Sequence, residues 1–404
     1  MRTQKGDLKV PDYIKKIILH LKEFGKETYL AGGTVRDLYL NREPEKWEVS
    51  TEALPEEIPK FLFQRGLECQ VSERGLGSFT IRKSGIWVEI SSFRSNDEGG
   101  DKVGNFVSGT LEEDAKRRDF SCNCVYYDPI LEQFWDPTEN GLNSLENRDF
   151  FFINDDDDAI DKDPLRILRA VSLCLTKEMR PLALTASMRK NAHKLKRVPR
   201  ERISKELISW ISQIDSPETL FVLLEKWGIK EIVFKPYLAE IMKPPPKNFI
   251  LLERERKHPE VFWSLFFIHQ SFGHRINKIA PFIESFMLDK ERAKVVDLFV
   301  RFLQSYYYMK LNRSQGDAYR VKKEFLLRKV SPETLRCFAA CVSRIYPDEI
   351  HKDLSKYAEE FIKWKFYGDG LDSKLEKLKG PERSRAIGLN EEDIVNFPFT
   401  LNDL

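Results

Sequence analysis

The pattern of secondary structure along this chain changes once, near residue 155. Before that point, short runs rich in β-branched and aromatic residues alternate with segments of helical spacing. After about residue 160 the strand signals nearly vanish, and amphipathic helical stretches continue to about Lys379. We therefore predict an α+β head domain over residues 1–154, a helical neck over 155–214 and a helical body and tail over 215–404.

The elements behind this prediction are short in the head and longer afterwards. The predicted strands are Tyr29–Gly33, Trp47–Thr51, Gly77–Arg82 and Ile86–Phe93. The predicted helices include Val35–Asn41, Pro55–Gln64, Pro164–Cys174, Leu182–Leu195, Arg202–Ile214 and Pro217–Trp227.

The charges of the chain nearly cancel, because 66 Lys and Arg residues stand against 64 Asp and Glu residues, for a net charge of +2. This balance excludes a basic arm or an acidic tail, so a nucleic-acid surface must come from local clustering. The longest apolar run, Val261–Ile268, is far shorter than the roughly 20 residues of a membrane helix, and we see no secretory signal. Six cysteines in so long a chain form no disulfide framework. We expect a protein of the reducing cytoplasm, with no membrane partner.

A glycine pair, Gly32 and Gly33, joins a predicted strand to a predicted helix and is followed closely by Arg36 and Asp37. Glycines let backbone N–H groups approach a phosphate, and the helix N-terminus adds partial positive charge. The motif could therefore hold a phosphate. The alternative is an ordinary strand-to-helix turn in which Arg36 pairs with Asp37.

The next predicted strand carries Lys46 and Glu48, two residues apart and so on one face. Two carboxylates at this spacing could hold a pair of Mg²⁺ ions for nucleotidyl transfer, but a cationic lysine is no metal ligand. A further acid, Glu89, lies inside an otherwise apolar strand, where it is costly unless it is paired or binds metal. The alternative for Glu89 is a place on the solvated face.

Two further groups of charged residues lie near predicted helix ends. Arg118 and Asp119 could clamp a nucleotide phosphate and sugar, or form a surface salt bridge. Asp163 starts a helix before Pro164, and Arg166 lies one turn further on, so both could face one ligand or simply cap the helix. The run Asp155–Asp158 is interpreted as a solvated loop rather than a metal site.

Together these motifs resemble, in order, the family of tRNA nucleotidyltransferases (CCA-adding enzymes) and bacterial poly(A) polymerases, class II of the polymerase-β-like nucleotidyltransferases. The resemblance covers about half the chain, from about Tyr29 to Leu207. The matching segments are Leu30–Leu40, Lys46–Thr51, Val88–Arg94, Arg117–Asn123, Asp163–Val171 and Val198–Leu207.

The resemblance implies Mg²⁺-dependent addition of nucleotides from CTP and ATP to an RNA 3′ end, with the tRNA acceptor end as partner. Glu48 and Glu89 would then be the catalytic, metal-holding acids. The implied nucleotide-binding residues are Gly32, Gly33 and Arg36 for the triphosphate, Arg118 and Asp119 for the nucleotide, and Asp163 and Arg166 for the base.

The chain departs from the family pattern where the metal should bind. Lys46 and Glu48 stand at the two positions of the family's Asp-x-Asp, Lys162 stands where Glu is usual, and the loop Asn96–Phe106 lacks the usual Asp, Arg and His. Lys46 could itself occupy the cation site, which would keep the fold while removing the reaction. The sequence therefore leaves three hypotheses open: a CCA-adding enzyme, a poly(A) polymerase, or a catalytically silent RNA-binding paralogue.

A basic segment supports RNA as the partner. From Met188 to Lys205 eight Lys or Arg residues stand against one Glu, a local charge of +7. Such clusters neutralise phosphates without reading sequence, although a solvated helix face is the alternative. The RNA-binding residues predicted within it are Lys194, Lys196, Arg197 and Arg200.

The cysteines have a simple interpretation. Cys122 and Cys124 fall on a predicted strand, and Cys337 and Cys341 fall one turn apart on a predicted helix. Neither pair has a matching second pair, so buried thiols are favoured over zinc.

Overall fold

The computed structural model describes residues 1–72, 77–83, 85–95, 107–214, 216–234, 249–271, 292–300 and 330–345. The chain forms two compact units, Met1–Lys194 and Leu195–Leu404. The predicted divisions at residues 154 and 214 stay predictions. Among the helices of the described ranges, none has the length and apolar character that a membrane crossing requires.

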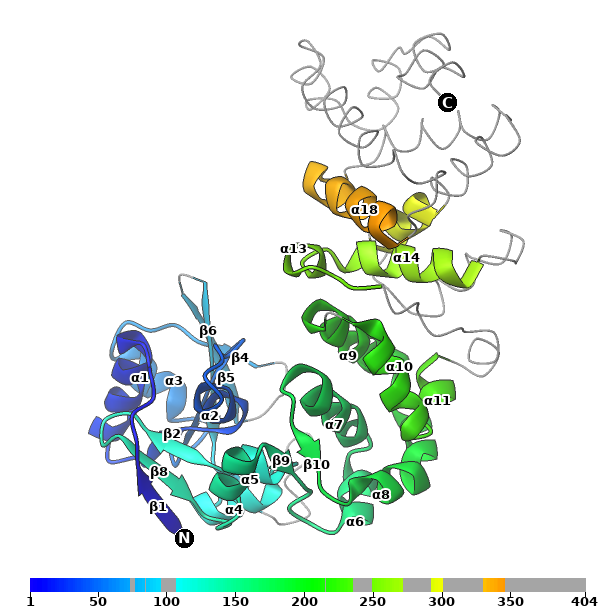
Figure 1. Ribbon diagram of the computed structural model, residues 1–404. Helices are drawn as coiled ribbons and strands as arrows, with labels where there is room; N and C mark the ends of the chain where they lie inside the picture. Colours follow the sequence, from blue (N-terminus) through cyan, green and yellow to red (C-terminus); the bar gives the residue numbers. More distant parts are fainter. Residues whose placement is uncertain are drawn as a thin grey trace, which may run out of the picture. The chain divides into compact units, whose positions relative to one another are not determined.

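Unit 1 is built on an eight-stranded sheet with the strand order β1-β8-β7-β2-β3-β6-β5-β4 (Figure 1). The strands are β1 Arg2–Lys5, β2 Thr28–Leu30, β3 Trp47–Thr51, β4 Gln70–Val71, β5 Ser78–Lys83, β6 Ile86–Ser92, β7 Tyr126–Asp128 and β8 Gln133–Asp136. Strands β3 and β6 pair in parallel, whereas the other neighbouring strands of this sheet run antiparallel.

One face of the sheet is apolar and covered by helices. Helix α1 (Asp12–Glu23) contacts β2 and β3 and packs beside α3 (Ile58–Phe63). Its buried side chains recur at helical spacing, which gives α1 one apolar stripe, and burying each contributes about 1.5–3 kcal/mol. These side chains are Ile14, Ile17, Ile18 and Leu21. On the strands the same face carries Leu30, Val49, Val88 and Ile90, all buried.

The opposite face carries the charged residues of β3 and β6, and an aromatic cluster closes it at one end. Tyr29, Phe93 and Tyr126 pack there against helix α4 (Leu111–Arg117). Glu48 and Glu89 lie on this face because they alternate with the buried residues Val49 and Val88. Because the apolar residues that alternate with them are buried on one face, both carboxylates project from the opposite face of the sheet.

The glycine pair begins a helix and does not end a strand. Strand β2 stops at Leu30, and helix α2 (Gly32–Tyr39) starts with Gly32 at a φ of +62°. The predicted strand Tyr29–Gly33 is therefore too long. The physical reason is that Gly32 adopts a left-handed backbone conformation, which turns the chain and which L side chains rarely adopt.

The remaining elements of unit 1 are mostly helical. They are α5 Gly141–Asn147, β9 Asp149–Phe150, α6 Asp156–Lys162, α7 Leu165–Thr176, β10 Arg180–Pro181, α8 Leu184–Asn191 and, across the unit boundary, the 3₁₀ helix η2 Ala192–Arg197. The run Asp155–Asp158 is not a loop, because Asp155 caps α6 by accepting hydrogen bonds from the Asp157 and Asp158 amides at 3.0 and 3.3 Å. Acids favour a helix N-terminus, so the run starts a helix.

Cys122 and Cys124 lie in a turn, so the predicted strand around them is wrong. Cys122 belongs to the 3₁₀ helix η1 (Ser121–Asn123) and Cys124 follows it. The turn forms because the amides of Asn123 and Cys124 donate to the Phe120 and Ser121 carbonyls. Both cysteines are buried, as expected.

In the described ranges of unit 2 every named element is a helix. These elements are α9 Arg200–Gln213, α10 Pro217–Lys226, α11 Lys230–Phe234, α13 Glu253–Arg256, α14 Pro259–Ser271 and α18 Pro332–Ile345. Their core is aromatic, with Trp210, Trp227 and Trp263 fully buried. The helical tail predicted beyond residue 345 lies outside the described residues.

Candidate active site

The parallel pairing of β3 and β6 sets Glu48 directly beside Glu89, since the two residues are register partners. Lys46 lies between their carboxylates: its Nζ is 2.9 Å from Glu48 Oε1 and 2.6 Å from Glu89 Oε2. Glu89 is buried, with 3% of its side chain exposed, and it also accepts a hydrogen bond of 2.9 Å from Ser72 Oγ. The structure thus brings all three residues together on one face of the sheet.

This arrangement does not fit a pair of divalent ions. A two-metal site needs carboxylate oxygens that face the ions, and the Lys46 ammonium already contacts one oxygen of each acid. The three side chains carry a net charge of −1, whereas two acids alone would carry −2. Lys46 therefore stands where the cation of such a site would be.

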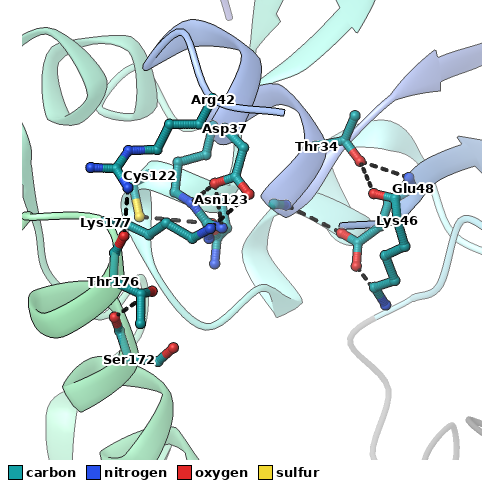
Figure 2. Close-up of polar contacts among 12 residues, drawn as sticks. Thr34, Asp37, Arg42, Lys46, Glu48, Cys122, Asn123, Ser172, Thr176 and Lys177 are labelled. Atoms are coloured by element: carbon teal, nitrogen blue, oxygen red, sulfur yellow. Dashed lines mark hydrogen bonds and ion pairs between the residues drawn. The ribbon is translucent and has the colours of Figure 1, made fainter. Parts of the chain in front are cut away.

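Glu48 also reaches the glycine turn at the start of α2. Its Oε2 accepts a hydrogen bond of 3.2 Å from the Gly33 amide. Thr34 fixes the same helix to β3, because its Oγ1 accepts from the Glu48 amide at 2.7 Å and donates to the Lys46 carbonyl at 3.1 Å (Figure 2). The first turn of α2, which would cradle a phosphate, is therefore in contact with the acid of β3.

Arg36 is held by other residues of the head. Its Nε and Nη2 donate to Asp37 Oδ1 at 2.9 and 2.7 Å, and its Nη1 donates to Asn123 Oδ1 at 2.8 Å. Lys177 on α7 forms an ion pair with the other oxygen of Asp37 at 3.1 Å (Figure 2). The ion pair between Arg36 and Asp37, which the sequence offered as the alternative to a phosphate site, is thus present.

Arg118 lies against the glycine turn and is tightly positioned. It donates to Tyr126 Oη at 3.0 Å, to Ser50 Oγ at 3.1 Å and to Asp114 Oδ2 at 3.0 Å. Burial alone would lower its pKa, but Tyr126 and Asp114 outweigh burial and raise the pKa of Arg118 well above its ordinary value. A methyl group added at Gly32 would lie 2.6 Å from Arg118 Nη1, which shows how close the two residues are.

Asp119 and Asp163 come together through Arg169. One guanidinium nitrogen of Arg169 lies 3.5 Å from Asp119 Oδ2 and 3.4 Å from Asp163 Oδ2. Burial would raise the pKa of Asp119, but the Arg169 charge, the 2.8 Å hydrogen bond from Asn123 and the Arg166 charge outweigh it, and the pKa is lowered. Asp119 is therefore an anion at neutral pH.

Arg166 combines burial with hydrogen-bond donors that are not used. Its Nη2 donates to the Arg117 carbonyl at 3.3 Å, while its buried Nε and Nη1 have no hydrogen-bond partner among the residues that the structure describes. Unsatisfied buried donors cost free energy, so a ligand that accepts from them would be stabilised.

The four basic residues predicted to bind RNA differ in their surroundings. Lys194, in unit 1, is largely buried and pairs with Asp161 at 2.8 Å. In unit 2, Arg200 donates to the Ile232 carbonyl at 3.1 Å, whereas Lys196 and Arg197 are exposed. The four residues thus differ in exposure: Lys196 and Arg197 are exposed, whereas Lys194 and Arg200 are partly buried.

Sequence reasoning missed several residues that hold the site. Tyr126 and Ser50 position Arg118, and Thr34 fixes α2 to β3. Asp114 could have been found, because it lies four residues before Arg118 on a predicted helix end, a spacing that favours ion pairs. The others carried no such signal.

A second group of metal-type ligands was also missed, in unit 2. Atoms of His258, Glu333 and Cys337 lie within 4.8 Å of one another. However, His258 Nδ1 is within 3.0 Å of Thr334 Oγ1, and burial raises the pKa of Cys337 to about 11. These contacts are those of a hydrogen-bonded cluster with a protonated thiol, in line with the interpretation of Cys337 as a buried thiol.

The fold and the site are similar to those of nucleotidyltransferase head domains. Residues 28–150 match the model described as the Poly A polymerase head domain, and residues 183–242 match the probable RNA and SrmB-binding site of polymerase A. The resemblance found in the sequence is therefore confirmed: two segments of the chain match the two models of this family, in order. Nucleotidyltransferases of this family generally use a divalent metal.

The known proteins to which this chain is similar are named poly(A) polymerase I or CCA-adding enzyme. Poly(A) polymerase I of Haemophilus influenzae is 30% identical over 233 residues, which cover 54% of this chain and 50% of that protein. The chain spans about half the length of such curated relatives. The CCA-adding enzyme of Bacillus stearothermophilus in complex with CTP has a TM-score of 0.66 at 21% identity, over 96% of this chain and 94% of that one.

The fold similarity extends beyond the head. The CCA-adding enzyme of Thermotoga maritima complexed with tRNA has a TM-score of 0.57 at 16% identity, over 99% of this chain and 96% of that one. The expected fold class, a polymerase-β-like α+β head followed by helices, is thereby confirmed.

Proposed function

We propose that the protein transfers nucleotides to the 3′ end of RNA, and that its reaction is the completion or repair of the CCA end of tRNA from CTP and ATP. The observation that carries this proposal is the position of Glu48, which lies beside Glu89 and against the Gly32–Gly33 turn. The similar proteins named CCA-adding enzymes, one with CTP and one with tRNA, support it. Poly(A) synthesis is the related alternative, because curated relatives also bear that name.

The nucleotide would be held between α2 and α7. Gly32 and Gly33 would face the triphosphate with Arg36 beside them, and Arg118 and Asp119 would engage the nucleotide. Asp163 and Arg166 would read the base, and the unused donors of Arg166 support that role. Lys196 and Arg197, being exposed, would contact the RNA phosphates together with Lys194 and Arg200.

The reaction is proposed for the cytoplasm. All six cysteines are free thiols, which supports a reducing compartment.

A second function is favoured by the contacts of Lys46 and Glu48. Lys46 stands in the cation position between the two acids, and Glu48 accepts the Gly33 N–H that would donate to a phosphate. The Lys46 ammonium thus takes the place of the metal cation, and the Glu48 carboxylate takes the place of the phosphate anion at the Gly33 amide. This self-occupied site supports a catalytically silent protein that binds RNA, in which Mg²⁺ has no role.

One experiment separates the two functions. Purified protein is incubated with Mg²⁺, labelled CTP or ATP, and tRNA that lacks its 3′ end. Incorporation that is lost in Glu48→Ala supports the enzyme, and dependence on CTP separates CCA addition from poly(A) synthesis. No incorporation by the wild type, with transfer gained in Lys46→Asp/Glu48→Asp, supports the silent protein. The double change removes the ammonium and places acids at both positions of the family's Asp-x-Asp, where they could bind the metal ions.

If neither protein transfers nucleotides while both bind tRNA, the enzymatic proposal is wrong. The Lys162 position and the segment Asn96–Phe106, which lies outside the described residues, would then be the next places to examine.

A further inference from the structure

An exposed tryptophan lies on the same face of the sheet as the acids of the site. Trp87 and Glu89 are two residues apart on β6, so both side chains leave the strand on one side, about 6.6 Å apart along the strand. Trp87 is 40% exposed, although large aromatic side chains in the described ranges are mostly buried. The other strongly exposed aromatic of unit 1 in those ranges is Phe63, on α3.

Arg82 accompanies Trp87. It is the register partner of Trp87 on β5, and its guanidinium carbon lies 4.8 Å from the centroid of the Trp87 ring. The side chain of Arg82 is exposed as well. A cation–π contact attracts the guanidinium to the face of the ring and holds the two side chains together. The pair thus offers a flat aromatic surface and a positive charge next to Glu89.

We propose that Trp87 and Arg82 form a stacking platform for an unpaired base at the RNA 3′ end. The proposal rests on the proposed function, in either of its two forms, because both require bound RNA. Aromatic rings and arginine planes stack unpaired bases, and an arginine also meets the phosphate beside the base. The location fits an RNA 3′ end, because Trp87 lies two residues before Glu89 on β6 and on the same face, next to the proposed site of nucleotide transfer.

The test compares two fluorescein-labelled hairpin RNAs, one with a short unpaired 3′ tail and one blunt-ended. The full chain and the variants Trp87→Ala, Trp87→Phe and Arg82→Ala are titrated with each. Because stacking of one base is worth about a 5- to 150-fold change in affinity, Trp87→Ala should weaken binding of the tailed RNA about fivefold or more and leave the blunt RNA unchanged. Trp87→Phe retains a ring and should recover most of the affinity.

Phe63→Ala is the matched control, because it removes an exposed aromatic side chain from another element of the same unit. It should bind both RNAs as the wild type does. Equal affinity of Trp87→Ala and the wild type for the tailed RNA would overturn the platform while leaving RNA binding intact. An equal loss for both RNAs would overturn it too, since the contact would then not involve an unpaired base. If the wild type binds neither RNA, the platform and the proposed function both fail.

Discussion

Gly32 occupies a space that no other residue can fill without displacing its neighbours. Its φ is +62°, and an added Cβ would overlap the Glu48 carboxylate and lie 2.6 Å from Arg118 Nη1. Gly32→Ala should therefore lower the free energy of unfolding by about 1–2 kcal/mol from backbone strain alone, and more from the overlap. Urea denaturation measures the change.

Gly33→Ala is the control for this prediction. A Cβ at Gly33 would meet only the end of the Arg36 side chain, at 3.3 Å, and Gly33 has no positive φ. We expect Gly33→Ala to cost clearly less than Gly32→Ala. Equal costs would show that the close contact of Gly32 with Glu48 and Arg118 does not constrain the turn.

Asp119 should make stability depend on pH at the acid end of the range. Its pKa is lowered from the ordinary 3.8 in the folded protein, so its contribution is present above the unfolded pKa and is lost as pH falls through the folded pKa. Asp119→Asn should lower the free energy of unfolding by about 1–2 kcal/mol at neutral pH. The gap to the wild type should stay constant down to about pH 5 and shrink below about pH 4. A gap that widens below pH 4 would contradict the assignment.

Single residues show where sequence reasoning ends. That Lys46 could occupy a cation site follows from its charge and its place in the motif. The contact of Glu48 with the Gly33 amide cannot be inferred from the sequence in this way. It depends on the length of one side chain and on the distance between β3 and α2. The unused donors of Arg166 are likewise invisible in the sequence, since burial and partners exist only in the fold.

At the scale of elements, a buried ion network ties α2 to α7. Asp37 on α2 pairs with Arg36 at 2.7 Å and with Lys177 at the end of α7 at 3.1 Å, and all three side chains are at most 12% exposed. Asp37→Ala leaves two buried cations without their anion, which typically costs about 3–5 kcal/mol. Thermal unfolding should show a large drop in Tm.

Asp37→Asn and Lys177→Ala serve as controls for this network. The amide keeps an acceptor for Arg36, and loss of Lys177 removes a cation without leaving one unpaired. Both should cost less than Asp37→Ala. If Lys177→Ala costs as much, packing of the lysine stem, and not its charge, connects the helices.

Element types were easier to predict than their pairing. The strand Trp47–Thr51 was predicted with the bounds that β3 has, because β-branched and aromatic residues fill it. Its parallel pairing with β6 could not be predicted from local pattern, since about forty residues separate the two strands, and this pairing alone sets Glu48 beside Glu89. The short turn at Cys122–Cys124 was mistaken for a strand because its buried, apolar neighbours mimic one.

At the scale of the whole molecule, the order of segments predicted the architecture. An alternating first part and a helical remainder correspond to a sheet-based unit and a unit whose described elements are helices. The charge balance of the whole sequence, in contrast, excluded only a basic arm or an acidic tail and named no partner. Only the local concentration of Lys and Arg around residues 188–205 pointed to RNA.

That basic segment yields the last prediction, which concerns how tRNA binding depends on salt. Lys196 and Arg197 are exposed, whereas Lys194 and Arg200 are partly buried. Each phosphate contact contributes about 0.7–0.9 to the slope of log K against log salt, because it releases condensed counterions. Lys196→Ala/Arg197→Ala should therefore flatten the slope by about 1.4–1.8.

The double variant Lys194→Ala/Arg200→Ala removes the same charge and is the matched control. Its slope should change less, because Lys194 and Arg200 are less exposed than Lys196 and Arg197 and therefore meet fewer RNA phosphates. Filter binding of tRNA over a range of salt concentrations measures both slopes. Equal flattening in the two variants would mean that RNA draws Lys194 and Arg200 out of their contacts. An unchanged slope in both would assign the cluster to the solvated helix face and place the RNA elsewhere on the molecule.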